Sequence, residues 1–344
     1  MSAVDLRGPE ARVDRLDSSE SSQDRSFEAS RLRWLGTLLV APLLMVPVGF
    51  VGQDPSERAA FVEAVVDAAA VSESLEPTLP LAMNSRVERW MKAFETTRRM
   101  ELDDLLARRE IYAEMIRGKL RARDMPQELL YIPMIESGLS PYAVSPVSAV
   151  GMWQFMSPTA VQYGLRVDEY VDERRDPVAA TDAALDYLEW LYGRFQGSWY
   201  LAAAAYNAGP GRVERILKRY AADREWTEDL YWEILAYLPR ETREYVPKMI
   251  AVTKLANDAD ALGFPASDYE PYRYDNVFVP GGTTLESVAR ALDVAERGLW
   301  LLNPHLTRGI TPPNEMYGVR IPIGGGATVV NALAESSTAR FADD

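Results

Sequence analysis

Short helical patterns separated by proline and glycine fill the stretch from Pro126 to Leu262, and this alternation constrains the fold more than any other feature of the chain. Asp176-Pro177 opens one pattern, because Asp caps a helix N-terminus and Pro fits the first helical turn. Small and apolar residues then recur on one face, at Ala180, Ala184, Leu188 and Leu191. Similar patterns cover about 211–221, 228–237 and 241–262. The sequence therefore predicts a small, Ala-rich, all-α domain.

Two further helical features flank the start of this region. A long amphipathic helix is predicted from about Ser85 to Arg121. In the helix that begins near Pro126, Pro133 removes one backbone hydrogen bond, which predicts a bend just before Glu136. Gly138 can end that helix in the left-handed conformation.

After Pro265 the pattern changes to strand, turn, helix, helix and strand. Residues 277–289 read as a strand, a turn and the start of a helix, 294–303 as a second helix, and 318–322 as a closing strand. We therefore expect a βααβ module at 272–324, followed by a Gly/Ala/Ser tail at 325–344. The all-helical domain is expected at 125–265.

The N-terminal third divides into three segments. Residues 1–33 are polar and predicted to be disordered. Residues 34–53 carry no charge and are about 20 residues long, the length that a membrane-spanning helix needs. With Arg31 and Arg33 before it, this segment is either an inner-membrane anchor or a signal peptide, and both interpretations export everything after Gln53. Residues 54–124 are expected to form a helical region with a linker.

Composition narrows the chemistry. The formal net charge of −14 argues against a nucleic-acid partner. The chain has no cysteine and one histidine, His305, which leaves neither a thiolate or His-based metal site nor a Ser-His pair. No metal and no cofactor is therefore predicted, and the chemistry must use carboxyl, hydroxyl and amide groups.

Glu136 is the candidate catalytic residue because it is a lone carboxylate in an apolar frame, Tyr131-Ile132-Pro133-Met134-Ile135-Glu136. Loss of water around a carboxylate raises its pKa, so that it holds a proton near neutral pH and can act as a general acid. Glycoside hydrolysis normally needs a second carboxylate. The nearby candidates lie in charge-dense or helix-opening sequence that favours capping or surface roles: Asp168, Glu169, Asp172, Glu173, Asp176 and Asp182.

Four motifs in one order resemble the lytic murein transglycosylases with the goose-type lysozyme fold, and most closely their membrane-bound D type. They are the Glu136-Ser137 segment, Gly151-Met152-Trp153-Gln154-Phe155-Met156, Ala205-Tyr206-Asn207-Ala208-Gly209, and the late segment Pro239 to Pro247. The resemblance implies that a single carboxylate, Glu136, cleaves peptidoglycan without water and leaves 1,6-anhydro-muramic acid ends. The C-terminal module resembles a LysM glycan-binding module, although Gly281-Gly282 replaces the usual Gly-acid turn. Whether that module binds glycan stays open.

The same resemblance implies roles for five other residues. Gln154 is expected to bind sugar acetamido groups, with Gly151 allowing a close backbone approach. Tyr206 is expected to donate a hydrogen bond to Glu136 and to stack on a sugar. Three residues keep alternatives: Ser137 orients Glu136 or stays within the helix end, Asn207 binds substrate or caps its helix, and Tyr245 lies near Glu136 or packs in the core.

The sequence thus predicts an exported, inner-membrane-anchored enzyme of the cell envelope that faces the periplasm, or a periplasmic one if residues 34–53 are removed. Two other interpretations are a glycan-binding protein without activity and a muramidase that uses water. Protein partners cannot be read from the sequence.

Overall fold

The structure, a computed structural model, describes residues 78–342, and their side chains as far as residue 334. All of these residues belong to one compact unit, Ser72–Asp344. The predicted disordered segment at 1–33 and the predicted anchor or signal at 34–53 lie outside the described residues. No helix within 78–342 is long and apolar enough to cross a membrane.

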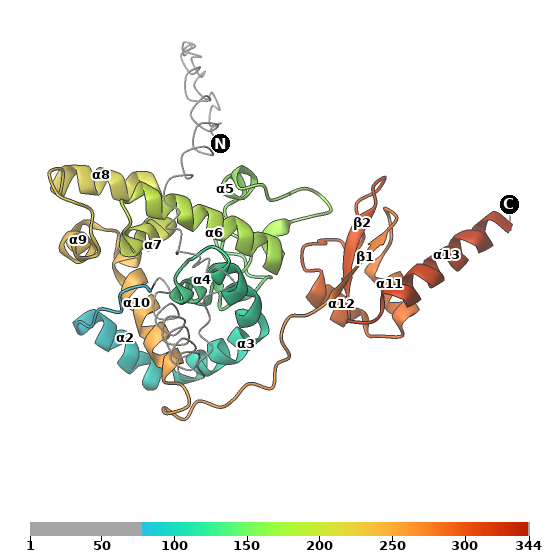
Figure 1. Ribbon diagram of the computed structural model, residues 1–344, viewed down its shortest axis with the longest axis horizontal. Coiled ribbons are helices and arrows are strands. Elements are labelled where there is room, and N and C mark those ends of the chain that lie inside the picture. Colours follow the sequence, from blue (N-terminus) through green and yellow to red (C-terminus); the bar gives the residue numbers. More distant parts are fainter. Residues whose placement is uncertain (1–77, 343–344) are drawn as a thin grey trace, which may run out of the picture. The chain divides into compact units, whose positions relative to one another are not determined.

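Helices are the main elements of residues 78–257 (Figure 1). In chain order they are α2 (Ser85–Glu95), α3 (Arg99–Arg121), η1 (Gln127–Leu130), α4 (Tyr131–Ser137), α5 (Ser157–Gln162), η2 (Glu173–Arg175), α6 (Pro177–Arg194), α7 (Trp199–Ala208), α8 (Pro210–Tyr220), α9 (Glu228–Ile234), η3 (Leu235–Tyr237) and α10 (Arg240–Asn257). The predicted all-α region is therefore correct, and most helix bounds differ from the expected ones by a few residues at most.

One predicted helix is wrong: the stretch expected from Ser85 to Arg121 is two helices. Thr96 leaves the helical conformation, with φ −124° and ψ −91°. Its hydroxyl donates to the Lys92 carbonyl at 2.6 Å, and side chains that bond to the backbone in this way compete with helix propagation.

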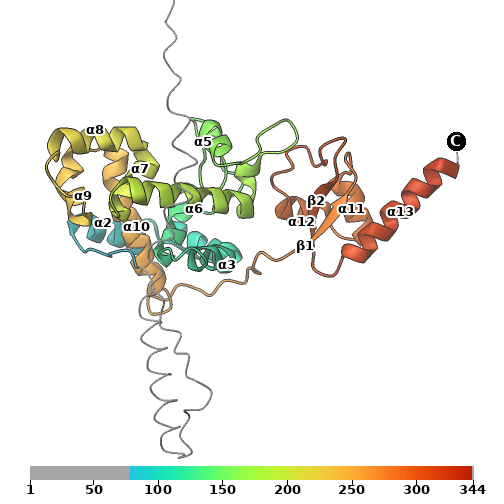
Figure 2. The same cartoon turned by 45° about the horizontal axis from the view of Figure 1, so that its top comes forward.

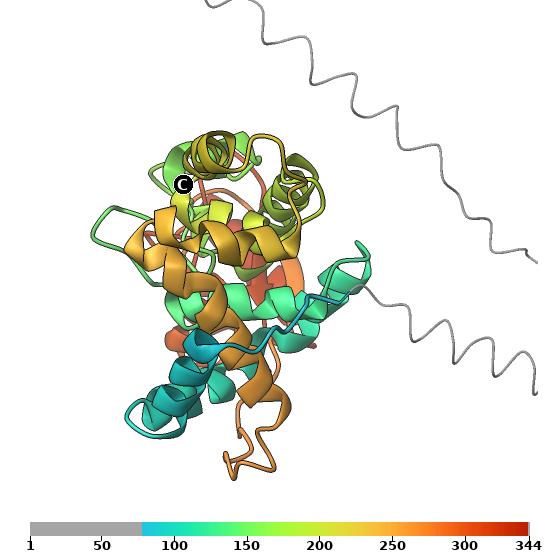
Figure 3. The same ribbon diagram turned by 90° about the vertical axis from the view of Figure 1, so that its left-hand side faces the viewer.

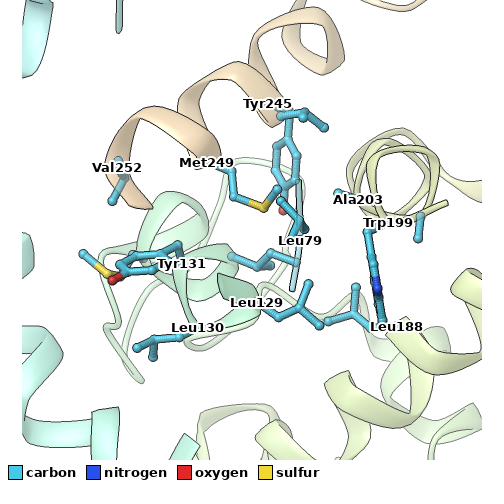
Figure 4. Close-up of a cluster of buried hydrophobic side chains, with 14 of the residues drawn as sticks. Leu79, Leu129, Leu130, Tyr131, Leu188, Trp199, Ala203, Tyr245, Met249 and Val252 are labelled. Carbon is cyan, nitrogen blue, oxygen red and sulfur yellow. The ribbon is translucent and has the colours of Figure 1, made fainter. Parts of the chain in front are cut away.

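The core of the helical region forms around α7 and α10. All residues from Trp199 to Ala205 of α7 are buried, because a run of small alanines lets other helices approach closely. Helix α10 crosses the region with α2 beside it (Figure 3). In Figure 4, Tyr245 and Met249 of α10 meet Leu79 and Leu129 in one buried cluster.

The segment that carries Glu136 begins as a 3₁₀ turn and continues as α4. Pro133 lies in the first turn of α4, where its missing N–H breaks no α-helical bond, so the predicted disruption inside a longer helix does not occur. Gly138 ends α4 in the left-handed conformation, with φ 63° and ψ 36°, as predicted.

The C-terminal module has the predicted βααβ order. Strand β1 (Asp275–Val279) pairs antiparallel with β2 (Tyr317–Ile321), with Val277 opposite Val319. Helices α11 (Leu285–Leu292) and α12 (Glu296–Leu302) lie between them in sequence. A Cβ on Gly281 would lie 2.5 Å from the Pro312 carbonyl oxygen, so the first turn position requires glycine. At the altered second position, Gly282 has a φ of +80° and nothing lies within 4 Å of a Cβ.

The segment expected as a tail from residue 325 contains a helix, α13 (Gly326–Ala342). Its Val329 is fully buried in the core of the module, and partly buried Leu333 packs on that core. The hydrophobic pair at i and i+4 gives the helix one apolar side, which the Gly/Ala/Ser-rich composition concealed.

The loop before α6 contacts the C-terminal module. Val171 is buried among the apolar residues of the module, and the Asp172 amide donates to the His305 carbonyl at 2.9 Å. The buried carboxylate of Asp176, which caps α6, pairs with Arg320 at 2.7 Å. The two regions therefore share both apolar and ionic contacts.

Candidate functional site

Glu136 lies one residue before the last residue of α4 and is partly exposed to solvent. The Tyr245 hydroxyl of α10 donates a hydrogen bond to Glu136 Oε1 at 2.7 Å. This contact joins two segments that are 109 residues apart in the chain. Tyr245 itself is 7% exposed, so it packs in the core and reaches Glu136 at the same time.

Burial raises the pKa of Glu136 to about 7. The hydrogen bond from Tyr245 and the charge of Lys248 lower it, whereas the charge of Glu241 raises it. Burial, together with the nearby Glu136 charge, holds the pKa of Tyr245 well above its ordinary value, so Tyr245 keeps its proton and acts as the donor. Glu136 is therefore a carboxyl group that can both give and take a proton near neutral pH.

Tyr206 does not bond to Glu136, which corrects the expected hydrogen bond. Its hydroxyl donates to the Trp153 carbonyl at 2.7 Å. Its ring lies against Tyr187, with 5.4 Å between the ring centroids. Tyr206 still lies near Glu136, because the Glu136 charge contributes to the raised pKa of Tyr206 after burial. The tyrosine that bonds to Glu136 is Tyr245.

Ser137 tethers the end of α4 to the glycine-containing loop. Its hydroxyl lies 2.8 Å from the Met152 carbonyl and 3.3 Å from the Pro133 carbonyl, and it accepts from the Ser140 amide at 3.2 Å. These contacts place Ser137 in the helix end, and they fix the loop 151–154 beside the residue that follows Glu136.

Gly151 is required where it stands. Its φ is +82°, and a Cβ there would lie 1.7 Å from the Arg174 carbonyl oxygen. Gln154 follows with φ 51°, and its side-chain amide donates to the Gly151 carbonyl at 2.8 Å. The close backbone approach predicted for Gly151 is thus made to the η2 segment of the chain itself.

Asn207 links the end of α7 to the start of α10. Its amide donates to Glu241 at 3.1 Å, and its carbonyl accepts from the Thr242 hydroxyl at 2.8 Å. Asn207 and Glu241 remain accessible to solvent.

Glu241 and Lys248 were not among the predicted site residues, although both influence the Glu136 carboxylate. Positions 241, 245 and 248 are spaced by four and three residues, so they share one face of α10. Once Tyr245 was singled out, this spacing was the signal that could have found the other two.

The other carboxylates considered from the sequence have local structural contacts. Asp168, Asp172, Glu173 and Asp176 accept backbone amides, and Asp182 pairs with Lys119 and Arg123. Glu169 pairs with Arg308. In the part of the chain that the structure describes, no group of three or more His, Cys, Asp or Glu residues could hold a metal ion.

Comparison with known proteins identifies the class of the two regions. Residues 115–228 match the Transglycosylase SLT domain, and residues 273–338 match the LysM-like domain of lytic transglycosylase MltD. The family resemblance predicted from the motifs is confirmed, and the chain carries an SLT domain and a LysM-like domain. The predicted fold class, mainly α and lysozyme-like with a small βααβ module, is confirmed with it.

The chain is also similar to individual lytic murein transglycosylases. The chain is 39% identical over 169 residues to the membrane-bound lytic murein transglycosylase D of Escherichia coli K12, covering 48% of this chain and 36% of that protein. It is 28% identical over 145 residues to the soluble lytic murein transglycosylase of the same strain, covering 41% and 22%. The chain thus matches only about a third of the length of the first relative and less of the second.

A solved structure with a related region is the 70 kDa soluble lytic transglycosylase SLT70 of Escherichia coli. It has a TM-score of 0.37 and 25% sequence identity, and the match covers 44% of this chain and 24% of that one.

Proposed function

We propose that this protein is a lytic transglycosylase that cleaves the β-1,4 bond between N-acetylmuramic acid and N-acetylglucosamine in peptidoglycan without water. The observation that carries the proposal is the Glu136 carboxyl group, whose pKa is raised to about 7 by burial and which accepts a hydrogen bond from Tyr245. The SLT domain match at 115–228 supports the same reaction class.

In the proposed mechanism, Glu136 first gives its proton to the glycosidic oxygen, and the bond from that oxygen to C1 of the muramic acid breaks. The C6 hydroxyl of the same sugar then attacks C1 and transfers its proton to the Glu136 carboxylate. A 1,6-anhydro ring closes, Glu136 is again protonated, and no water is consumed. A pKa near the working pH suits a group that must act as acid and then as base.

Other residues take positioning and binding roles in this proposal. Tyr245 orients the Glu136 carboxylate, and Gln154, Tyr206 and Asn207 line the path of the glycan. Ser137 acts indirectly, through its hydrogen bond to the loop that carries Gln154. The proposed catalytic domain covers 125–265, after a helical region and linker at 54–124, and the proposed LysM-like module covers 272–324, extended by α13.

The first test is the identity of the product. Digestion of peptidoglycan in ¹⁸O-water should give unlabelled 1,6-anhydro ends, and a Glu136→Gln variant should lose activity by roughly 10²-fold to 10⁴-fold, since the amide cannot transfer a proton. Label in the new reducing ends would identify a hydrolase, and a Glu136→Gln variant with normal turnover would remove Glu136 from the mechanism.

Hydrolysis is the second candidate, favoured by one observation. The charge of Glu241 raises the pKa of Glu136, so a second carboxylate lies within electrostatic reach, and glycoside hydrolases use two. The ¹⁸O experiment separates the two functions.

We also propose that the protein works in the cell envelope, facing the periplasm, with residues 34–53 as its inner-membrane anchor. The membrane-bound relative and the uncharged 34–53 stretch support this. N-terminal sequencing of the protein from a membrane fraction tests it, because a soluble chain that starts after residue 53 would indicate a cleaved signal peptide.

A further inference from the structure

Helix α8 carries a cationic face, on which Arg219 lies over the Tyr220 ring at 5.5 Å from its centroid. The helix has four basic residues and one acid, and the acid, Glu214, pairs with Arg194 of α6. Arg212, Arg215 and Arg219 are spaced by three and four residues and share one exposed side. In the part of the chain with described side chains, these three guanidinium groups form no ion pair or hydrogen bond. Such a cluster is unexpected in a chain with 51 acidic and 37 basic residues.

Two exposed tyrosines complete this surface. The rings of Tyr220 and Tyr237 stack with 3.7 Å between centroids and 7° between planes. Tyr220 is 45% exposed and Tyr237 50% exposed, so a large part of each side chain remains in contact with water. Together with the three arginines and Ile216 they line a cavity of about 330 Å³. A concave site that combines aromatic rings with convergent charges is typical of ligand binding.

The surface is continuous in sequence with the candidate active site. Helix α8 begins directly after the segment that holds Asn207, and Tyr237 precedes Glu241 by four residues. Asn207 and Glu241 are hydrogen bonded to each other. The Arg215 side chain extends back along α8 toward Gly211, and its Nη1 lies 3.6 Å from the position that a Cβ on Gly211 would take. Helix α8 lies at the periphery of the helical region in two views (Figures 1 and 2).

We propose that Arg212, Arg215, Arg219, Tyr220 and Tyr237 form a binding site for the acidic stem peptide of peptidoglycan and the sugar that carries it. The proposal rests on the proposed function and names the part of its substrate that this site recognises. Guanidinium groups pair with carboxylates through two parallel hydrogen bonds, and stem peptides present several carboxylates. An exposed tyrosine ring offers a flat apolar face to a sugar ring.

A lipid surface fits these residues less well. A helix that lies in a membrane interface turns an apolar face toward the lipid. Helix α8 instead directs Val213 and Leu217, both 0% exposed, into the protein core. The arginines then surround a cavity with two tyrosines rather than flank an exposed apolar stripe.

The test compares two substrates and two matched charge variants of the full chain. The first variant is Arg212→Gln/Arg215→Gln/Arg219→Gln. The second is Arg224→Gln/Arg273→Gln/Arg290→Gln, which makes the same charge change at three exposed surface pairs outside the site. The substrates are glycan strands that carry stem peptides and the same strands after an amidase has removed the peptides.

We expect the first variant to raise KM for the peptide-bearing strands roughly tenfold more than for the stripped strands. The variant removes three exposed ion pairs between arginines and the stem peptide, and each such pair contributes modestly to binding. The control variant should change both KM values equally. Tyr237→Ala should weaken binding of both substrates, because it removes the surface for the sugar, and Tyr237→Phe should restore it.

Equal effects of the first variant on both substrates would overturn the proposal. So would arginine-dependent binding to vesicles that contain phosphatidylglycerol without any binding of a soluble disaccharide-peptide. If the wild-type chain cleaves neither strand, the proposed function fails, and calorimetric titration with the disaccharide-peptide still tests the site. Binding that is lost in the first variant and kept in the control would then support the site alone.

Discussion

The protonation of Glu136 depends on neighbours with opposite effects. Burial dominates and raises the pKa to about 7, Tyr245 and Lys248 lower it, and Glu241 raises it. Three of these four influences come from a single face of α10. Glu136, which transfers the proton, therefore lies on α4, whereas the residues that shift its pKa lie on α10.

Opposite substitutions on α10 should move the pKa of Glu136 in opposite directions. Glu241→Gln removes a negative charge and should lower this pKa, whereas Lys248→Met removes a positive charge and should raise it. Because the reaction begins with protonated Glu136, activity should fall as pH rises through the pKa of Glu136. The pH at which activity falls should therefore be lower in Glu241→Gln and higher in Lys248→Met. A carboxyl ¹³C titration checks both directly.

Glu233→Gln is the matched control, because Glu233 is an exposed carboxylate whose partner is Arg224. It should leave the Glu136 titration in place. Shifts of the same sign in Glu241→Gln and Lys248→Met would contradict the assigned electrostatics.

Ionisation of the Glu136 carboxyl group should also lower the free energy of unfolding at high pH. Its folded pKa of about 7 lies above the ordinary value of 4.5, so the folded state holds the proton more tightly. Stability therefore decreases as pH rises from about 4.5 through 7. Glu136→Gln removes the cost, and at pH 8 it should unfold with a free energy roughly 1–3 kcal/mol higher than the wild type. Urea unfolding at pH 5 and pH 8 measures this, and a gain that is the same at both pH values would rule out the ionisation of Glu136 as its cause.

At the scale of elements, one loop determines how the site is assembled. Residues 151–154 lie against η2 on one side and against Ser137 on the other. The side-chain amide of Gln154 closes the turn on Gly151. The loop can approach η2 so closely only because position 151 has no side chain.

Two glycine substitutions separate this close contact from backbone strain. Gly151 and Gly164 both have a φ of +82°, but nothing lies within 4 Å of a Cβ on Gly164. Gly164→Ala should cost about 1–2 kcal/mol, the penalty of the left-handed conformation. Gly151→Ala adds a clash with backbone and should cost roughly 2–5 kcal/mol in all. Thermal unfolding compares them, and equal losses would mean that the Arg174 carbonyl moves aside freely.

Helices were predictable here because capping residues and apolar periodicity are local. The start of α6 at Asp176-Pro177 and the end of α4 at Gly138 follow from single residues. The break at Thr96 depends on a side-chain hydrogen bond, which a helical pattern does not reveal. Helix α13 was missed because only Val329 and Leu333 give its Gly/Ala/Ser-rich segment an apolar side.

The candidate site was predictable to the same extent. The apolar frame of Glu136 is local, and so the raised pKa was predicted from the sequence. The sequence did not predict which tyrosine donates to Glu136. Tyr206 and Tyr245 come from two helices far along the chain, and the packing of these helices determines that the Tyr245 hydroxyl contacts Glu136 while the Tyr206 hydroxyl contacts Trp153. The role of Gly151 was expected from its type, but its neighbour, the Arg174 carbonyl, was not.

At the scale of the whole molecule, a buried ionic cluster joins α6 to the C-terminal module. Asp176 is 4% exposed and His305 3% exposed, and Arg320 pairs with Asp176. Burial alone would raise the pKa of Asp176, but the charge of Arg320 and hydrogen bonds from Arg320 and the Ala179 amide hold this pKa below its usual value. Burial lowers the pKa of His305 to about 4, so His305 is neutral at pH 7. Arg320 is therefore the cation that compensates Asp176.

Arg320→Met should destabilise the helical region, although the substitution is in strand β2 of the module. It leaves the buried Asp176 carboxylate without its cation, at a cost of roughly 3 kcal/mol. The pKa of Asp176 then rises, so the loss should be largest at neutral pH and should shrink toward pH 4, where the carboxyl group can take up a proton. Circular dichroism at 222 nm follows mainly the described helices between residues 85 and 257. The matched variant Arg290→Met removes an arginine that pairs with Glu286 on the surface of α11, and should cost less than about 1 kcal/mol. Equal, small effects of both variants on the helical transition would mean that the module and the helical region unfold independently, and that the Asp176–Arg320 pair contributes little to holding them together.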